Sequence, residues 1–269
     1  MVTDITSSDY LDLQHAARKL ETQSLAMKVA ERLGMPMETL LHMLPAGAQR
    51  SISTAVNKAL EQCLRVALHV GPKASIANNK RTHTAAVAVS GAVGGFFGLP
   101  GLLIELPITT TVMLHSIVEI ARSQGEDLRN PESALACMEV FALGPDNRVN
   151  RQGEALESAY YVSRTALTQA TREASSYLVR KGMTREGAPA LVSFVGKIAS
   201  RFGLEVSEKV AAEIVPIAGA AGGMTLNILF SRHFQSVAEG HFVVRRLERK
   251  YGAEAVRLHY ERARLMLGV

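Results

Sequence analysis

Residues 82–123 read THTAAVAVSGAVGGFFGLPGLLIELPITTTVMLHSIVEIARS, and this stretch decides the fold. No Asp, Glu, Lys or Arg occurs between Arg81 and Glu105, and none occurs between Glu105 and Glu119. Leaving so much apolar surface in water would cost about 25 cal/mol per Å². We therefore expect the rest of the chain, or a lipid bilayer, to cover this stretch.

A second stretch of the same kind, VAAEIVPIAGAAGGMTLNILFS, occupies residues 210–231 and has no charge from Ile214 onward. Its glycines Gly219 and Gly223 are four residues apart, as are Gly91 and Gly95, and this spacing allows helices to approach closely. We predict that the two stretches pack on each other. The residues that we assign to helix packing or to contact with lipid are Gly91, Gly94, Gly95, Phe96, Phe97, Gly98, Leu99, Gly219 and Gly223.

Apolar residues recur every three or four positions along most of the chain, which is typical of amphipathic helices. The pattern predicts helices over residues 8–33, 48–70, 84–97, 106–123, 131–144, 154–180 and 188–202, with an exposed loop at 146–153. Gly98-Leu99-Pro100-Gly101 predicts a break, because glycine and proline interrupt helices. We expect an all-α protein: one domain over residues 1–269, resembling a helical bundle around two glycine-rich apolar helical hairpin segments, at 82–123 and 210–231.

The net charge of +5 is uneven, because the tail 232–269 holds eight Lys or Arg and four Asp or Glu. Within this tail, Arg245, Arg246, Arg249 and Lys250 form a basic patch. A basic patch beside apolar segments favours an anionic membrane surface over nucleic acid, although a solvated helix face has the same composition. The polar N-terminus is typical of neither a signal peptide nor a transit peptide. We expect a cytoplasmic protein, peripheral or re-entrant at the inner face of the cell membrane.

Few residues suggest chemistry. The sequence contains no P-loop, HExxH, GxSxG or Cys/His cluster, so we expect no cofactor and no metal. Glu105 lies between two apolar runs, where a carboxylate is costly unless it is paired or neutralised. Its role would be catalysis, proton transfer or binding of a cationic headgroup, or it would simply cap the start of the next helix. His115 and Glu119 are four residues apart and share a helix face. These three residues are the weak catalytic candidates.

Two long strings, GGFFGLPGLLIELPITTTVMLHSIVEIARSQGEDL at 94–128 and GHFVVRRLERKYGAEAV at 240–256, closely resemble the bacterial EcsC family. The resemblance extends over most of the chain. The family takes its name from a protein encoded beside an ABC transporter, which implies a membrane-protein partner of that kind. It implies no activity and no catalytic residue.

Three hypotheses follow from the residues. The first is a non-catalytic, membrane-associated helical protein that binds lipid or assists a transporter. The second is a soluble all-α protein that buries the same apolar stretches in its core and binds an apolar ligand. The third is a hydrolase or protease-like enzyme that uses Glu105, His115 and Glu119.

Overall fold

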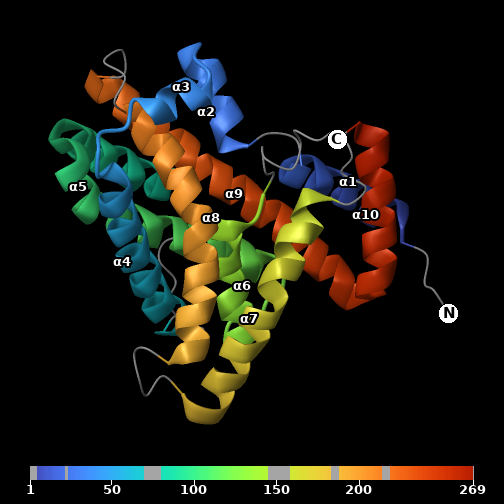
Figure 1. Ribbon diagram of the computed structural model, residues 1–269. Helices are drawn as coiled ribbons and strands as arrows, with labels where there is room; N and C mark the ends of the chain where they lie inside the picture. The colour runs from blue at the N-terminus through green and yellow to red at the C-terminus, as the bar shows by residue number, and fades with distance from the viewer. Residues whose placement is uncertain are drawn as a thin grey trace.

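The computed structural model describes residues 5–21, 24–69, 80–144, 158–182, 188–213 and 219–268, with only the backbone described for 27, 32, 69, 80–100, 102 and 219–224. The described residues form helices and no strand, which confirms the all-α expectation (Figure 1). The helices are α1 (Ser7–Glu21), α2 (Leu25–Leu33), α3 (Met37–His42), α4 (Ala48–His69), α5 (Lys80–Ser123), α6 (Pro131–Glu139), the short 3-10 helix η1 (Val140–Ala142), α7 (Ala159–Lys181), α8 (Pro189–Glu213), α9 (Gly219–Tyr251) and α10 (Ala253–Leu267). The expected loop at 146–153 lies outside the described residues.

The two long helices α5 and α9 form the most extensive helix pair of the structure, and α4 covers another side of α5. Side chains join α5 and α9 along their length, since Asn227 Nδ2 donates to Glu105 Oε1 at 2.9 Å and Gln235 Nε2 donates to Ser116 Oγ at 3.0 Å. The helices that carry the two apolar stretches therefore pack on each other.

The break that we predicted at residues 98–101 is wrong, because α5 is one helix of 44 residues. Pro100 and Pro107 lie inside it, so the central segment is not a helical hairpin. Local helix-breaking signals are weak relative to tertiary packing, and the described inner face of α5 is buried against α4 and α9. The hydroxyls of Thr110 and Thr111 donate to the carbonyls of Leu106 and Pro107, at 2.6 and 2.7 Å, which gives these polar groups partners within the helix.

The N-terminal helix also differs from its prediction. The single helix expected over 8–33 is split into α1 and α2, with Ser24 outside both. Packing explains the split, because both helices contact α9 but α1 also packs on α10 whereas α2 packs mainly on α8. Figure 1 shows α1 and α10 together beside the C-terminal half of α9, away from the end of the molecule where α5 and α4 lie.

A core of phenylalanines lies where α8, α9 and η1 meet. Phe141 and Phe202 have ring centroids 5.1 Å apart, Phe230 and Phe234 are also 5.1 Å apart, and all four are fully buried. We predicted that the helix beginning at residue 188 would end at 202, but α8 continues to Glu213 and contributes Lys209 to the interior. Its extra turns place a lysine beside the carboxylate of Glu105.

Candidate functional site

A buried ionic cluster of Glu105, Lys209, Glu213 and Asn227 joins α5, α8 and α9. Lys209 Nζ lies 3.0 Å from Glu105 Oε1 and 3.2 Å from Glu213 Oε1, and Asn227 Nδ2 donates to the same Glu105 oxygen. Lys209 is only 1% exposed and Glu105 6%. From the sequence, a carboxylate at this position is costly unless it is paired, neutralised or at a headgroup boundary, and these contacts pair it. The alternative role at the start of a helix is wrong, because Glu105 lies inside α5.

The charges of this cluster do not balance, because one lysine faces two carboxylates. Burial by itself would lower the pKa of Lys209, but the charges of Glu213 and Glu105 outweigh burial and raise it. Burial raises the pKa of Glu213, and Glu105 acts in the same direction. Ion pairs of this kind hold helices in one arrangement, since removing one partner leaves a buried charge without compensation.

An apolar edge of α5 adjoins this cluster, since Ile108 lies three residues after Glu105 on the helix. Ile104 is 70% exposed and Ile108, one turn further along the helix, is 50% exposed; Val112, one more turn along, is half-buried. We call these three residues the α5 edge. It belongs to the segment Leu103–Ser123, which is long and apolar enough to cross a membrane, although 61% of its most apolar window is buried inside the protein.

The other two catalytic candidates lie further along α5. His115 Nδ1 is 2.9 Å from the carbonyl oxygen of Thr111, and Glu119 follows one turn later. Ten residues separate His115 from Glu105, which is about 15 Å along a helix axis. The structure therefore does not bring Glu105 and His115 together. Among the described residues, no three His, Cys, Asp or Glu side chains are grouped as a metal site requires.

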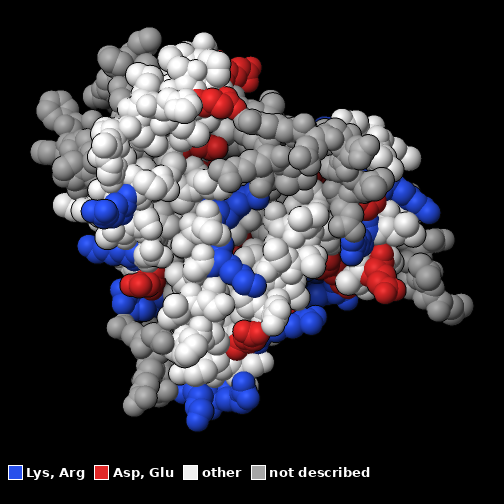
Figure 2. Space-filling model, viewed as in Figure 1, with Lys and Arg blue, Asp and Glu red and all other residues white. Residues whose placement is uncertain are grey.

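The basic patch of the tail is paired within the protein. Arg246 Nη2 donates to Asp12 at 2.5 Å, and Lys250 Nζ donates to Asp9 at 2.7 Å, so both hold α1 against α9. Figure 2 shows Lys and Arg interspersed with Asp and Glu on the face in view, with no continuous basic field there.

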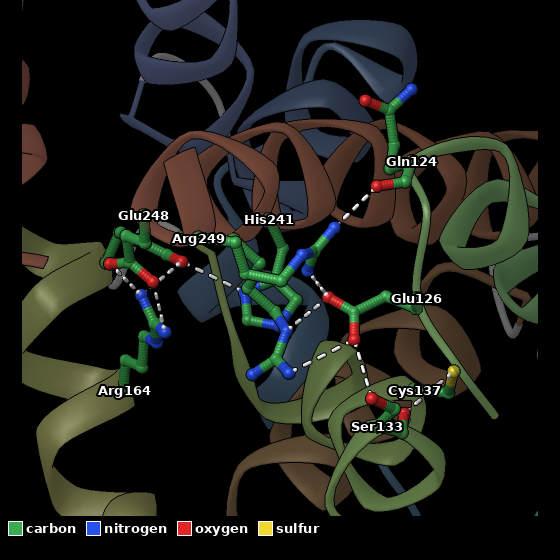
Figure 3. A network of polar contacts seen from close by, with 10 residues as sticks. Gln124, Glu126, Ser133, Cys137, Arg164, His241, Glu248 and Arg249 are labelled. Atoms are coloured by element: carbon green, nitrogen blue, oxygen red, sulfur yellow. Dashed lines mark hydrogen bonds and ion pairs between the residues drawn. The ribbon is translucent and has the colours of Figure 1, made fainter. Parts of the chain in front are cut away.

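The remaining two members of the patch, Arg245 and Arg249, converge on Glu126 in the loop after α5 (Figure 3). Arg245 Nε donates to Glu126 at 2.8 Å, and Ser133 Oγ donates to its other oxygen at 2.7 Å. Burial would raise the pKa of Glu126, but Arg245 outweighs burial and lowers it.

A second set of polar residues, which we did not predict, lies next to this network. Arg164 on α7 makes a fork of two bonds to Glu248 on α9, both 2.7 Å long (Figure 3). Arg164 also donates to the hydroxyl of Tyr160, which lies 2.9 Å from Nδ1 of the buried His241. Arginine and glutamate on helices predicted to be amphipathic give no sign of burial by themselves, so the sequence did not single them out.

For the glycine-rich residues, the structure describes only the helical backbone. Gly91, Gly94, Gly95, Phe96, Phe97, Gly98 and Leu99 lie in α5, and Gly219 and Gly223 lie in the first turns of α9; their exposure lies outside the described residues.

One comparison with known proteins gives an assignment. No curated protein and no solved structure matches this chain. The model of the EcsC protein family matches residues 8–247, which include α5, the buried ionic cluster and most of α9. The match covers most of the chain, and the protein therefore belongs to the EcsC family.

Proposed function

We propose that this protein is a non-catalytic, membrane-associated helical protein that contacts the lipid surface at the cytoplasmic face of the cell membrane through the α5 edge. The observation that carries this proposal is the exposure of Ile104 and Ile108 on a helix without a charge between Arg81 and Glu105. Exposed apolar residues continuous with an uncharged run mark interaction sites with membranes or proteins.

The burial of α5 favours a peripheral position over a full membrane crossing. The inner face of the segment Leu103–Ser123 packs inside the protein and carries the buried ionic cluster, so only its edge is available to lipid. Lys80 and Arg81, which precede the uncharged run, have the charge expected on the cytoplasmic side of a membrane.

Vesicle flotation tests the proposal. Wild-type protein should float with vesicles of phosphatidylcholine and phosphatidylglycerol, whereas Ile104→Glu combined with Ile108→Glu should weaken binding by about tenfold or more. Full burial of an isoleucine contributes roughly 1.5–3 kcal/mol, and these two side chains are 70% and 50% exposed. Val179→Glu combined with Val192→Glu is the matched control, because these valines are 71% and 57% exposed on α7 and α8.

Two outcomes decide against the proposal: wild-type protein that stays in the soluble fraction with every vesicle, or a control variant that loses as much binding as the α5 variant. If wild type ignores pure lipid but floats with native membrane vesicles, the α5 edge binds a membrane protein, for which an ABC transporter is the first candidate, and the direct lipid contact is wrong.

A further inference from the structure

A cleft of about 470 Å³ lies between α6, α7, α9 and α10, beside the network in Figure 3. Its lining includes Arg164 and Thr171 of α7 and Arg245 and Glu248 of α9. These side chains are largely buried, and they come from helices far apart in the sequence. The cleft is therefore a groove open to solvent whose floor is made of largely buried polar side chains.

One hydrogen-bond donor at this cleft is buried and has no acceptor among the described residues. It is the hydroxyl of Tyr161, whose side chain as a whole is 7% exposed and lines the cleft. Arg245, whose side chain is 15% exposed, also lines the cleft and donates from Nε and Nη2 to Glu126. A buried donor without an acceptor costs about 1–3 kcal/mol, so such groups are rare unless something else binds them.

The third feature of the cleft is Glu139, at the end of α6. This carboxyl is 5% exposed and accepts a hydrogen bond from Thr171 Oγ1. Burial raises its pKa, while Thr171 of α7 and the charges of Arg164 and Arg245 act in the opposite direction, and Glu132 of its own helix adds to the raising. Burial thus favours the protonated form of this carboxyl, which can donate a hydrogen bond, over the ionised form, which only accepts.

We propose that this cleft is a binding site for a small oxyanion, a carboxylate or a phosphate group, held by the Tyr161 hydroxyl and Arg245 beside the carboxyl of Glu139. An oxyanion accepts several hydrogen bonds at once, and bonds between a charged group and a donor are about twice as strong as neutral ones. Arg164 is not among the groups that bind the ligand, because its Nη1 and Nη2 both already donate to Glu248.

The ligand comes from the aqueous phase and not from the lipid surface. Asn227 and Glu248 lie on the same helix, 21 positions apart in the sequence, which is about 30 Å along the axis. Asn227 bonds to Glu105, the neighbour of Ile104 in the α5 edge, whereas Glu248 lines the cleft. The two proposed sites are thus independent, and each can be tested without the other.

Calorimetric titration of the full chain with sulfate, inorganic phosphate and acetate tests the site. At least one of these ions should bind in a saturable way. Tyr161→Phe should weaken that binding by about tenfold or more, because it removes one donor to a charged group, and it should leave the unfolding temperature near that of wild type. Tyr177→Phe, on the same helix but outside this cleft, is the matched control and should bind as wild type does.

The pH dependence of sulfate binding gives a readout that a structural role would not change, because sulfate itself does not titrate near neutral pH. Wild-type affinity should fall as the pH rises through the raised pKa of Glu139, since an ionised carboxylate repels the anion. Glu139→Gln keeps a neutral donor and should bind sulfate equally well over the same pH range.

Failure of all three ions to bind overturns the proposal. Binding that Tyr161→Phe leaves unchanged, with a pH dependence that Glu139→Gln also leaves unchanged, overturns it too, because the ion would then lie on exposed arginines. Preference for sulfate and phosphate over acetate identifies the ligand group as phosphate, and the reverse order identifies it as carboxylate. Tyr161→Phe should float with vesicles as wild type does, so the test of the anion site is independent of the test of membrane binding by the α5 edge.

Discussion

Lys209 compensates two buried carboxylates, and the stability of the α5–α8–α9 junction depends on it. Lys209→Met should lower the free energy of unfolding by about 3–5 kcal/mol, because it leaves Glu105 and Glu213 buried without a cation. Urea denaturation measures the loss. Adding Glu105→Gln and Glu213→Gln should recover part of it, since neutral amides need no counter-charge.

Lys19→Met is the control for this prediction. Lys19 pairs with Glu239 at 2.6 Å, but the two side chains are 40% and 32% exposed, and such a pair contributes less than about 1 kcal/mol. Equal losses for the two variants would show that burial does not distinguish the pairs.

His233 makes the folded state sensitive to acid. Burial, together with the charges of Lys28 and Arg201, lowers its pKa from 6.5 to about 3; Glu205 of α8 lies 3.8 Å away. As the pH falls through 6.5 the unfolded chain takes up this proton first, so stability should be complete above 6.5 and be lost toward pH 3, by at most about 1.4 kcal/mol per pH unit.

Urea midpoints measured over this pH range test the prediction. His233→Gln should remove this part of the pH dependence, and His42→Gln, at an exposed position on α3, should leave the slope as in wild type. An unchanged slope in His233→Gln would assign the acid sensitivity to other groups.

Single side chains were predictable only in part. Glu105 stood out because it is a carboxylate between apolar runs, but its partners Lys209 and Asn227 are 104 and 122 residues away, and no local pattern connects them. Glu139 carries the same signal in the run CMEVFAL and could have been identified by it. Arg164 and Tyr161 could not, because an amphipathic pattern does not show which polar residues are buried.

Among the helices, α1 and α9 make the closest described contact at a glycine. A Cβ atom added at Gly240 would lie 2.8 Å from Leu20 Cγ and 3.1 Å from the carbonyl oxygen of Ala16. Gly240→Ala should therefore destabilise the protein by about 1–3 kcal/mol in urea denaturation, even though alanine is the better helix former. Gly196→Ala and Gly203→Ala on α8 have nothing within 4 Å and should stabilise it, by up to about 1 kcal/mol each. A stabilising Gly240→Ala would show that α1 moves away from α9 at little cost.

Helix boundaries were predicted well where composition changes sharply and poorly where packing decides. The helix predicted over 48–70 corresponds to α4, because Gly71 and Pro72 follow it in the sequence. The predicted break at 98–101 and the predicted single helix over 8–33 were both wrong. For the N-terminal segment, its two halves pack on different helices, which outweighs its own residue preferences.

For the molecule as a whole, the pairing of the basic patch has a measurable consequence. Asp9, Asp12 and Glu126 neutralise its cations, so vesicle binding through the α5 edge should change little when salt is raised enough to shorten the Debye length from about 10 Å to about 3 Å. Flotation at the two salt concentrations measures this. Loss of binding at high salt would show that the basic tail, and not the α5 edge, contacts the membrane.

Glu21 at the end of α1 joins parts of the chain that are made at very different times. Its carboxylate accepts hydrogen bonds from Ser158 and from the first backbone amides of α7, and also from Tyr260 of α10. A chain leaves the ribosome N-terminus first, so α1 emerges 137 residues before Ser158 and 239 before Tyr260. The apolar face of α1 therefore stays uncovered until synthesis of the last helices is almost finished. During translation, this face is the part of the chain that would need a chaperone.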